Sequence, residues 1–328
     1  MLCSAFLSFA LICVLPGEYF TRWKISIALS GEPVEATYQQ IMESEGLDKS
    51  WIVQFFFWIK GVILHGTFGQ PMSGALRMIV GPEGLTLKYL LRPGGEIMNS
   101  FLLCGSSMLV AWIIAIVLGA ITALPSGKWL YRGLITITAP TMALPGFVSA
   151  GLVLWFLVVY VDRAYLLPSM WGMCGWQYAD CPMSWAKFGS CLGHIAPLWI
   201  IVGMPVFASS LKVFRASMQD QLGLRYITVA HGKGLSPRRV YLKHATRNAL
   251  NPLISTMGYT LPTVLMNAMM VGFMFDIPTY GSLLKAAVET QDPALLAAIL
   301  VFYSFVLVVG NFLADLGLAL ADPRIRYS

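Results

Sequence analysis

Five long, uncharged runs of apolar residues constrain this sequence more than any other feature. They lie at about residues 101–124, 134–161, 196–211, 251–275 and 294–314. A helix needs about 20 consecutive, mostly apolar residues to cross the hydrocarbon core of a bilayer. We therefore expect each run to be a transmembrane helix. The third run is short, and we expect it to continue through residues 212–214 while the Lys212 side chain reaches the interface.

A sixth and shorter apolar run opens the chain at residues 1–15, and the turn signal Pro16-Gly17-Glu18 follows it. The run has neither the positively charged start nor the small-residue cleavage site of a signal peptide. We expect it to be a first transmembrane helix that is truncated. The fold predicted from these runs is all-α, a polytopic integral membrane protein with six transmembrane helices.

The composition supports this class. Of the 328 residues, 57% are hydrophobic and 12% are charged, whereas soluble domains have about 45–50% apolar and about 25% charged residues. The net charge of +6 does not indicate a nucleic-acid partner, because most of the excess basic residues lie in one loop. We expect membrane lipid, and no nucleic acid, around this chain.

Basic residues in short loops predict the orientation, because Lys and Arg are retained on the cytoplasmic side. Between the expected spans at 196–211 and 251–275 a single acid, Asp220, accompanies eight basic residues, namely Lys212, Arg215, Arg225, Lys233, Arg238, Arg239, Lys243 and Arg247. This loop and both termini are therefore predicted to be cytoplasmic. Residues 16–100 would form an extracytoplasmic segment, and residues 101–328 a five-helix core that includes the loop at 215–250.

Two stretches on the predicted outer side carry further expectations. Residues 51–64, with the sequence WIVQFFFWIKGVIL, are apolar and aromatic but too short to span. We expect them to lie along the outer membrane interface, the alternative being a helix packed on the bundle. Cys174, Cys181 and Cys191 would face an oxidising compartment, where two of them could form a disulfide or all three could stay free.

The sequence offers little from which to build an enzyme. It has four histidines and no H-x-x-x-H pair, no G-x-S-x-G elbow and no phosphate-binding G-x-x-x-x-G-K-[ST] loop. The expected spans also lack charges in their middles, where proton- or sodium-coupled carriers keep ionisable groups. These features favour a pore driven by an external motor over a membrane-embedded enzyme. A passive channel or secondary carrier is the alternative.

The stretch from Tyr226 to Ala249 carries the most specific pattern. The pattern residues are Tyr226, Ala230, Lys233, Gly234, Leu235, Ser236, His244, Arg247, Asn248 and Ala249. This pattern resembles the coupling loop of ABC importer permeases, specifically the dipeptide, oligopeptide and nickel family. Three further stretches are similar to motifs of that family, namely LPGE at 15–18, VGFMFDIPTYG at 271–281 and DPRIRY at 322–327.

The resemblance implies a permease subunit that moves peptides, or nickel or another small solute, into the cytoplasm by alternating access. Its implied partners are a second permease, two ATP-binding subunits that hold ATP and Mg, and an extracytoplasmic solute-binding protein. This chain would bind no cofactor and lie in a bacterial-type plasma (inner) membrane. Gly272, Thr67 and Thr279-Tyr280 depart from the family pattern and leave the substrate open.

The resemblance also implies which residues receive force from the ATPase. The candidate coupling residues are Tyr226, Thr228, Ala230, Lys233, Gly234 and Leu235. We expect a lever helix over residues 221–233 that ends at Gly234, since glycine commonly terminates helices. Small residues at 230 and 234 would permit close approach of the partner. The alternative is that the basic loop only holds the anionic leaflet and fixes topology.

Overall fold

The computed structural model describes ten stretches of the chain. They are residues 3, 5–7, 10, 49–69, 84–92, 95–156, 159, 184–275, 277–290 and 292–321. The chain divides into two compact units, of which unit 1 comprises Met1–Asn99 and Pro278–Val306, and unit 2 comprises Ser100–Ile277 and Leu307–Ser328. The described residues form helices, with one isolated β-bridge between Thr67 and Thr86.

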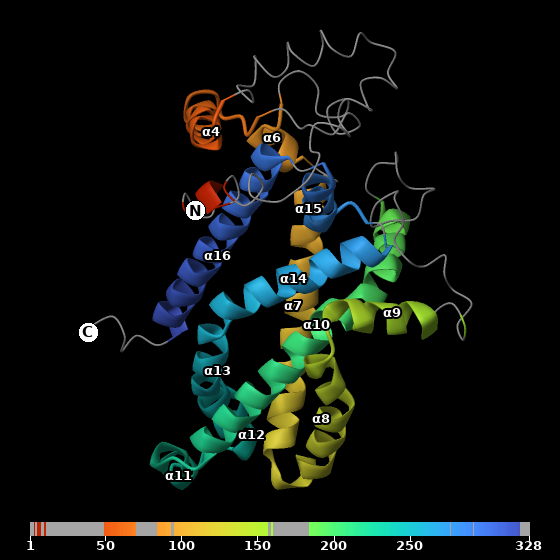
Figure 1. The fold of residues 1–328 in the computed structure, drawn as a ribbon. Coiled ribbons are helices and arrows are strands. Elements are labelled where there is room, and N and C mark those ends of the chain that lie inside the picture. The colour runs from red at the N-terminus through yellow and green to blue at the C-terminus, as the bar shows by residue number, and fades with distance from the viewer. Residues whose placement is uncertain are drawn as a thin grey trace. The chain divides into compact units, whose positions relative to one another are not determined.

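Among the described residues, three helices are long and apolar enough to cross a membrane (Figure 1). They are α7 (Glu96–Ala123), α10 (Trp185–Leu222) and α16 (Pro293–Ala321). They contain the first, third and fifth of the runs that we expected to span. The prediction of an all-helical membrane protein is confirmed at this level.

The second expected span, residues 134–161, is not one helix. It is divided into α8 (Lys128–Ala143) and α9 (Gly146–Phe156), which point in different directions in Figure 1. The break lies at Pro145, because a residue before proline is disfavoured in helical conformation and Leu144 is extended, with φ −82° and ψ 136°. The expectation of one continuous helix was wrong at this point.

The fourth expected span, residues 251–275, is also interrupted. It consists of the end of α13 (Thr246–Ser255) and all of α14 (Met257–Phe275). Between them, the Thr256 hydroxyl donates to the Leu253 carbonyl at 2.7 Å. Such a bond from a threonine back to the preceding turn bends a helix, so the apolar run continues while the helix axis changes direction.

Helix α10 is the longest helix of unit 2 and its centre. It begins after Ser184, whose hydroxyl accepts the Lys187 N–H at 3.2 Å, and it packs against α8, α9, α13 and α14. It approaches α7 closely at Gly119, where a Cβ atom would lie 2.7 Å from the Phe214 ring. Small residues permit such close packing between membrane helices, and α7 thereby becomes a fixed support for the end of α10.

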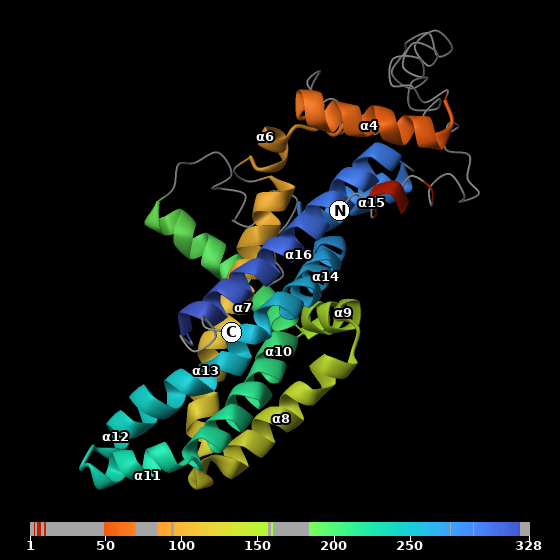
Figure 2. The same ribbon diagram turned by 90° about the vertical axis from the view of Figure 1, so that its left-hand side faces the viewer.

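Unit 1 contains α4 (Trp51–His65), α6 (Leu87–Leu90) and α15 (Tyr280–Glu289), together with the first part of α16 (Figure 2). Phe55 and Trp58 of α4 are buried against Ala297 and Ala298 of α16. The helix expected over residues 51–64 is thus present, and one face of it packs on protein. Its placement at a membrane interface stays a prediction.

Several sequence expectations fall wholly or partly outside the described residues. These are most of the first helix at 1–15, the turn at Pro16-Gly17-Glu18, the C-terminal motif at 322–327, and Cys174 and Cys181. Cys191 is described and is disulfide-bonded. Cys3 and Cys104 are free thiols.

Candidate coupling site

The basic loop, residues 215–250, folds as a hairpin of short helices at one end of unit 2. After α10 come α11 (Arg225–Gly232), α12 (Pro237–Arg239) and the π-helix η5 (Val240–Ala245), which leads into α13. In Figures 1 and 2 this hairpin lies at the same end of the unit as the turn between α7 and α8. It is the segment that carries the candidate coupling residues.

The lever helix is shorter than the expected residues 221–233. Helix α10 continues to Leu222, and the chain then turns at Gly223, whose N–H donates to the Asp220 carbonyl at 3.2 Å. Leu224 is extended, so α11 starts a new helix at Arg225. Glycine is a poor helix former in mid-helix, which explains why the single long lever was a wrong expectation.

The end of α11 follows the prediction for Gly234. Its backbone is left-handed, with φ +75°. Its N–H donates to the His231 carbonyl at 2.9 Å, and the Leu235 N–H donates to the Ala230 carbonyl at 3.3 Å. These two bonds form a Schellman motif, in which a glycine without Cβ strain closes the helix. Leu235 and Ala230 also pack in one hydrophobic cluster, which completes the motif.

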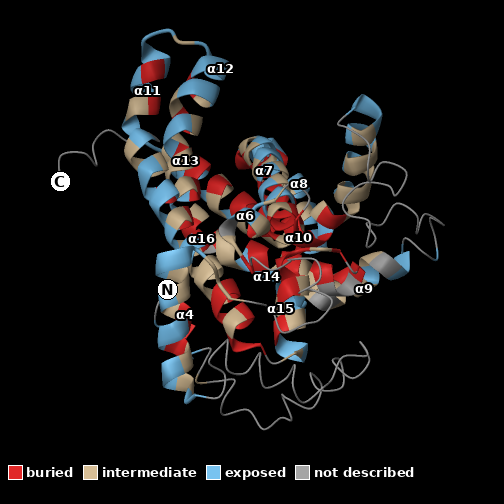
Figure 3. Cartoon of the chain, turned by 90° about the horizontal axis from the view of Figure 1, so that it is seen from above, coloured by how far each residue is buried: buried red, intermediate tan, exposed pale blue. Residues whose placement is uncertain are grey.

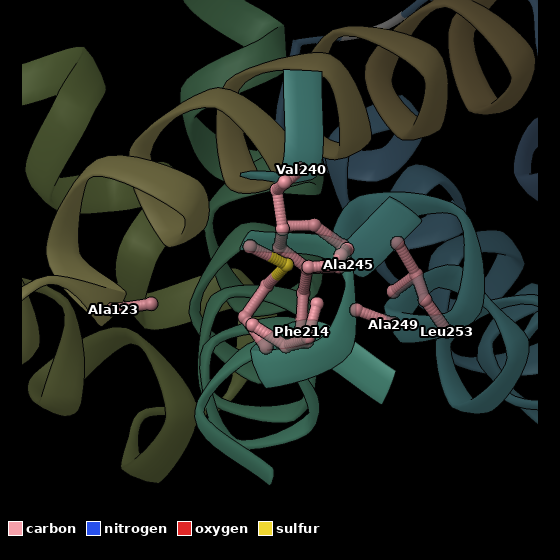
Figure 4. Close-up of a cluster of buried hydrophobic side chains, with 9 residues drawn as sticks. Ala123, Phe214, Val240, Ala245, Ala249 and Leu253 are labelled. Atoms are coloured by element: carbon pink, nitrogen blue, oxygen red, sulfur yellow. The ribbon is translucent and has the colours of Figure 1, made fainter. Parts of the chain in front are cut away.

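One face of α11 is buried in that cluster, which we name the hairpin core. Its buried members are Ala123, Phe214, Met218, Ile227, Ala230, Val240, Ala245, Ala249 and Leu253. Figure 4 shows that the labelled members come from α7, α10, η5 and α13 and gather in one place. Because Phe214 and Met218 are fully buried, α11 rests on an apolar base that a displacement of the helix would disturb.

Tyr226 adds a polar clamp at the edge of the hairpin core. Its hydroxyl donates to Gln221 Oε1 at 2.9 Å, at the end of α10, and accepts from Asn248 Nδ2 of α13 at 3.3 Å. One side chain therefore connects α11 with the helices on either side of the hairpin. Net stabilisation from a hydrogen bond is typically about 1 kcal/mol, so this clamp is modest beside the apolar packing.

Two further contacts attach the hairpin to α7. The Tyr241 hydroxyl donates to the Ala120 carbonyl, and burial raises the pKa of Tyr241. Arg215 donates through Nε to the Thr122 carbonyl at 3.1 Å. Both acceptors lie in the last turn of α7, where carbonyls have no partner within the helix.

The opposite face of α11 is exposed. Arg225, Thr228, Val229 and Lys233 lie on it, and α11 carries both exposed and buried residues in Figure 3. Val229 is an aliphatic residue with 56% of its surface exposed. The sequence reasoning missed Arg225 and Val229, although their i, i+3 and i+4 spacing with Thr228 would have grouped them on one helix face.

The six candidate coupling residues thus divide into exposed residues and residues that pack within the protein. Thr228, Lys233 and Gly234 are exposed, while Tyr226 and Leu235 are half-buried in the protein. Ala230 is 9% exposed and belongs to the hairpin core. Its small size fits packing within this chain, and the expected role of Ala230 in permitting close approach of a partner stays a prediction. In the part of the chain that the structure describes, no three His, Cys, Asp or Glu residues form a metal-binding group.

With this geometry established, comparison with known proteins is informative. Residues 115–327 match the family described as the binding-protein-dependent transport system inner membrane component. The chain belongs to this family. The matched range contains the whole basic loop, and the predictions of a multi-pass inner-membrane protein and of a transport permease are confirmed.

Individual members of the binding-protein-dependent transport family are similar along the whole chain. The dipeptide transport system permease protein DppB of Bacillus subtilis is 28% identical over 320 residues, which cover 98% of this chain and 92% of the relative. The di/tripeptide transport system permease protein DppB of Pseudomonas aeruginosa is 27% identical and covers 98% and 93%. The oligopeptide transport system permease protein AppB of B. subtilis is 25% identical and covers 98% and 93%.

Proposed function

We propose that this protein is the permease subunit of an ATP-driven peptide importer and that α11 receives the movement of an ATPase subunit. The printed names of the relatives, which are dipeptide, di/tripeptide and oligopeptide permeases, support the peptide substrate. The single observation that carries the coupling role is the division of α11 into a buried face and an exposed face. A lever needs one face for each of its two contacts.

The proposed assembly is the one that the similarity to binding-protein-dependent transport systems implies, and the absence of a nucleotide motif in the sequence agrees with it. This permease pairs with a second permease, two ATP-binding subunits with ATP and Mg, and an extracytoplasmic solute-binding protein. It has six transmembrane helices and cytoplasmic termini. Residues 1–15 are the first span, 16–100 the outer segment and 101–328 the core with the coupling loop at 215–250.

The proposed lever works through packing. An ATPase groove takes the exposed face of α11, with Thr228, Val229 and Lys233 at the contact. Closure of the groove displaces α11, and the hairpin core passes this displacement to α10 and α13 because close-packed side chains do not absorb it. Tyr226, Ala230 and Leu235 act as positioning residues, and Gly234 ends the lever.

The transport cycle is then alternating access. Binding of ATP closes the motor, the lever moves, and the path opens outward to accept solute from the binding protein; hydrolysis resets it. The bends at Pro145 and Thr256 interrupt two apolar segments of unit 2. Discontinuous helices of this kind line solute paths in other membrane transporters, which supports a transport role for these breaks.

The test compares two exposed aliphatic residues of the same hairpin. Val229 on α11 is 56% exposed and Leu242 on η5 is 63% exposed. The variants Val229→Glu and Leu242→Glu are purified from solubilised host membranes through a tag on this chain, and the co-purified ATPase activity is measured. We expect loss of the activity with Val229→Glu and retention with Leu242→Glu, because only Val229 lies on the lever.

Two results would contradict the proposal. Equal recovery of ATPase activity by both inserted, monodisperse variants would remove α11 from the interface. Recovery of no ATPase activity by the wild type, with solute uptake that persists after ATP depletion, would favour the passive channel or secondary carrier.

A further inference from the structure

A second exposed surface of the basic loop lies beside the lever but not on it. Arg238, Arg239, Leu242 and Lys243 are exposed on α12 and η5, while Val240 between them is buried in the hairpin core. Arg238 and Leu242, like Arg239 and Lys243, are four positions apart, which places the two adjacent pairs on one side of this helical segment. The surface therefore consists of three cations around one leucine that is 63% exposed.

Among the described residues, no carboxylate forms a salt bridge with this surface. The sequence has no Asp or Glu between Asp220 and Asp276. Within the described stretches, none of the three cations has a salt-bridge partner. Unpaired cations side by side repel one another, so an anionic partner from outside the chain would stabilise the arrangement.

The structure also places this surface close to the end of the membrane-spanning helix α7 in unit 2. Tyr241, between the cations, donates its hydroxyl to the Ala120 carbonyl, one turn from the end of α7 at Ala123. The next helix begins beside Trp129, which is 78% exposed and has the Arg132 guanidinium 5.0 Å from its ring. An exposed Trp beside a cation at the end of a span is typical of the membrane interface.

We propose that Arg238, Arg239, Leu242 and Lys243 bind the headgroups of anionic phospholipids in the cytoplasmic leaflet. The cations meet the phosphates, and Leu242 enters the boundary between headgroups and acyl chains, as on interfacial helices. This inference rests on the proposed cytoplasmic side of the loop, but it assigns these residues to lipid and not to the ATPase. The bound lipid holds η5 at the interface while α11 moves.

The test uses two double variants with the same change in charge. Arg238→Gln/Arg239→Gln removes two cations from the proposed lipid surface, and Arg225→Gln/Lys233→Gln removes two from the lever. Each full-length protein, in its complex, is reconstituted in nanodiscs of equimolar phosphatidylethanolamine and phosphatidylglycerol and re-extracted in mild detergent. The retained lipids are quantified by mass spectrometry, and co-purified ATPase activity is recorded in parallel.

We expect the wild type and the lever variant to retain phosphatidylglycerol in preference to phosphatidylethanolamine. In Arg238→Gln/Arg239→Gln the preference should fall at least about fivefold, the order expected for loss of one or more surface cations. Arg238→Lys/Arg239→Lys, which keeps the charges, should restore it. High salt should weaken the preference, because exposed charges are screened.

Three outcomes would overturn the inference. One is an unchanged preference for phosphatidylglycerol in Arg238→Gln/Arg239→Gln. Another is an equal loss of that preference in both double variants, which would show that it depends on the total charge of the protein. The third is loss of ATPase activity from Arg238→Gln/Arg239→Gln with no change in lipid, which would assign the surface to the ATPase. Failure of the lever proposal is seen separately, as normal ATPase recovery with Arg225→Gln/Lys233→Gln.

Discussion

Helix α4 in unit 1 and helix α11 in unit 2 are both too short to cross a bilayer, since 15 and 8 residues extend over about 22 and about 12 Å. Both end at a left-handed glycine, Gly66 with φ +63° and Gly234 with φ +75°. Both bury a narrow apolar face against the rest of their own unit. They differ in what the free face presents.

The free face of α4 is apolar apart from Lys60 and the terminal His65. Its exposed residues are Ile52, Val53, Phe56, Phe57, Lys60, Ile63, Leu64 and His65. The free face of α11 is mostly polar or basic, with Val229 as its exposed aliphatic residue. Each helix therefore has a left-handed glycine after its C-terminal end and a buried apolar stripe, and the chemistry of the free face determines which environment it suits. Lipid suits the first face, and water or a soluble subunit suits the second.

The largest effect is expected from the buried face of α4. Trp58 is 8% exposed, and its Nε1 donates to the Phe68 carbonyl at 3.1 Å. Trp58→Ala should lower the free energy of unfolding by about 3–5 kcal/mol, because it leaves a cavity and an unpaired carbonyl. Phe56→Ala, at a residue 63% exposed, should change it by less than about 1 kcal/mol. Denaturant titration in detergent measures both, and equal losses would refute the division of α4 into two faces.

The same division in α11 should separate stability from function. Ile227 is 5% exposed and lies in the hairpin core, so Ile227→Ala should cost about 2–5 kcal/mol in unfolding free energy. Val229→Ala should leave stability within about 0.5 kcal/mol and reduce co-purified ATPase activity. A stability loss with Val229→Ala comparable to that of Ile227→Ala would show that both faces of α11 are structural.

The glycine at the end of α11 provides a finer test. Gly234→Ala should destabilise the hairpin by about 1–2 kcal/mol, because an alanine is strained at φ +75°. Gly232→Ala is the matched control, since neither glycine has an atom within 4 Å of a Cβ and only Gly234 has a positive φ. The control should be neutral or stabilising. If the two variants unfold alike in the same titration, the Schellman turn does not depend on its glycine.

Sequence patterns predicted those features that depend on local chemistry. Hydropathy located α7, α10 and α16, and the glycine signal located the end of α11. The length of an apolar run, however, reports the free energy of transfer into lipid. It does not report whether the run forms one continuous helix. The break at Pro145-Gly146 had a visible signal, the same Pro-Gly dipeptide that predicted a turn after residue 15, but the apolar run concealed it.

The direction of each face of α11 could not be predicted in the same way. Ala230 and Thr228 are both small, and a single helix of eight residues gives no indication of which side meets the bundle. That choice depends on Phe214, Val240 and Ala249, which are distant in sequence and meet only in the folded hairpin. The positions of the candidate residues were therefore predictable, whereas their division into contact and positioning residues required the structure.

The smallest expected effect concerns the side-chain hydrogen bonds that Trp58 of α4 and Tyr226 of α11 make. Trp58 of α4 donates to a backbone carbonyl, whereas Tyr226 of α11 connects two side chains, Gln221 and Asn248. Tyr226→Phe should lower the free energy of unfolding by about 0.5–1.5 kcal/mol. In the Tyr226→Phe background, which lacks the hydroxyl, Asn248→Ala should lower it little further. A double-mutant cycle measures this coupling. Full additivity would mean that Asn248 contributes nothing through Tyr226, and that beside its apolar face α11 is held only by the bond from Tyr226 to Gln221, whereas α4 is held mainly by Phe55 and Trp58.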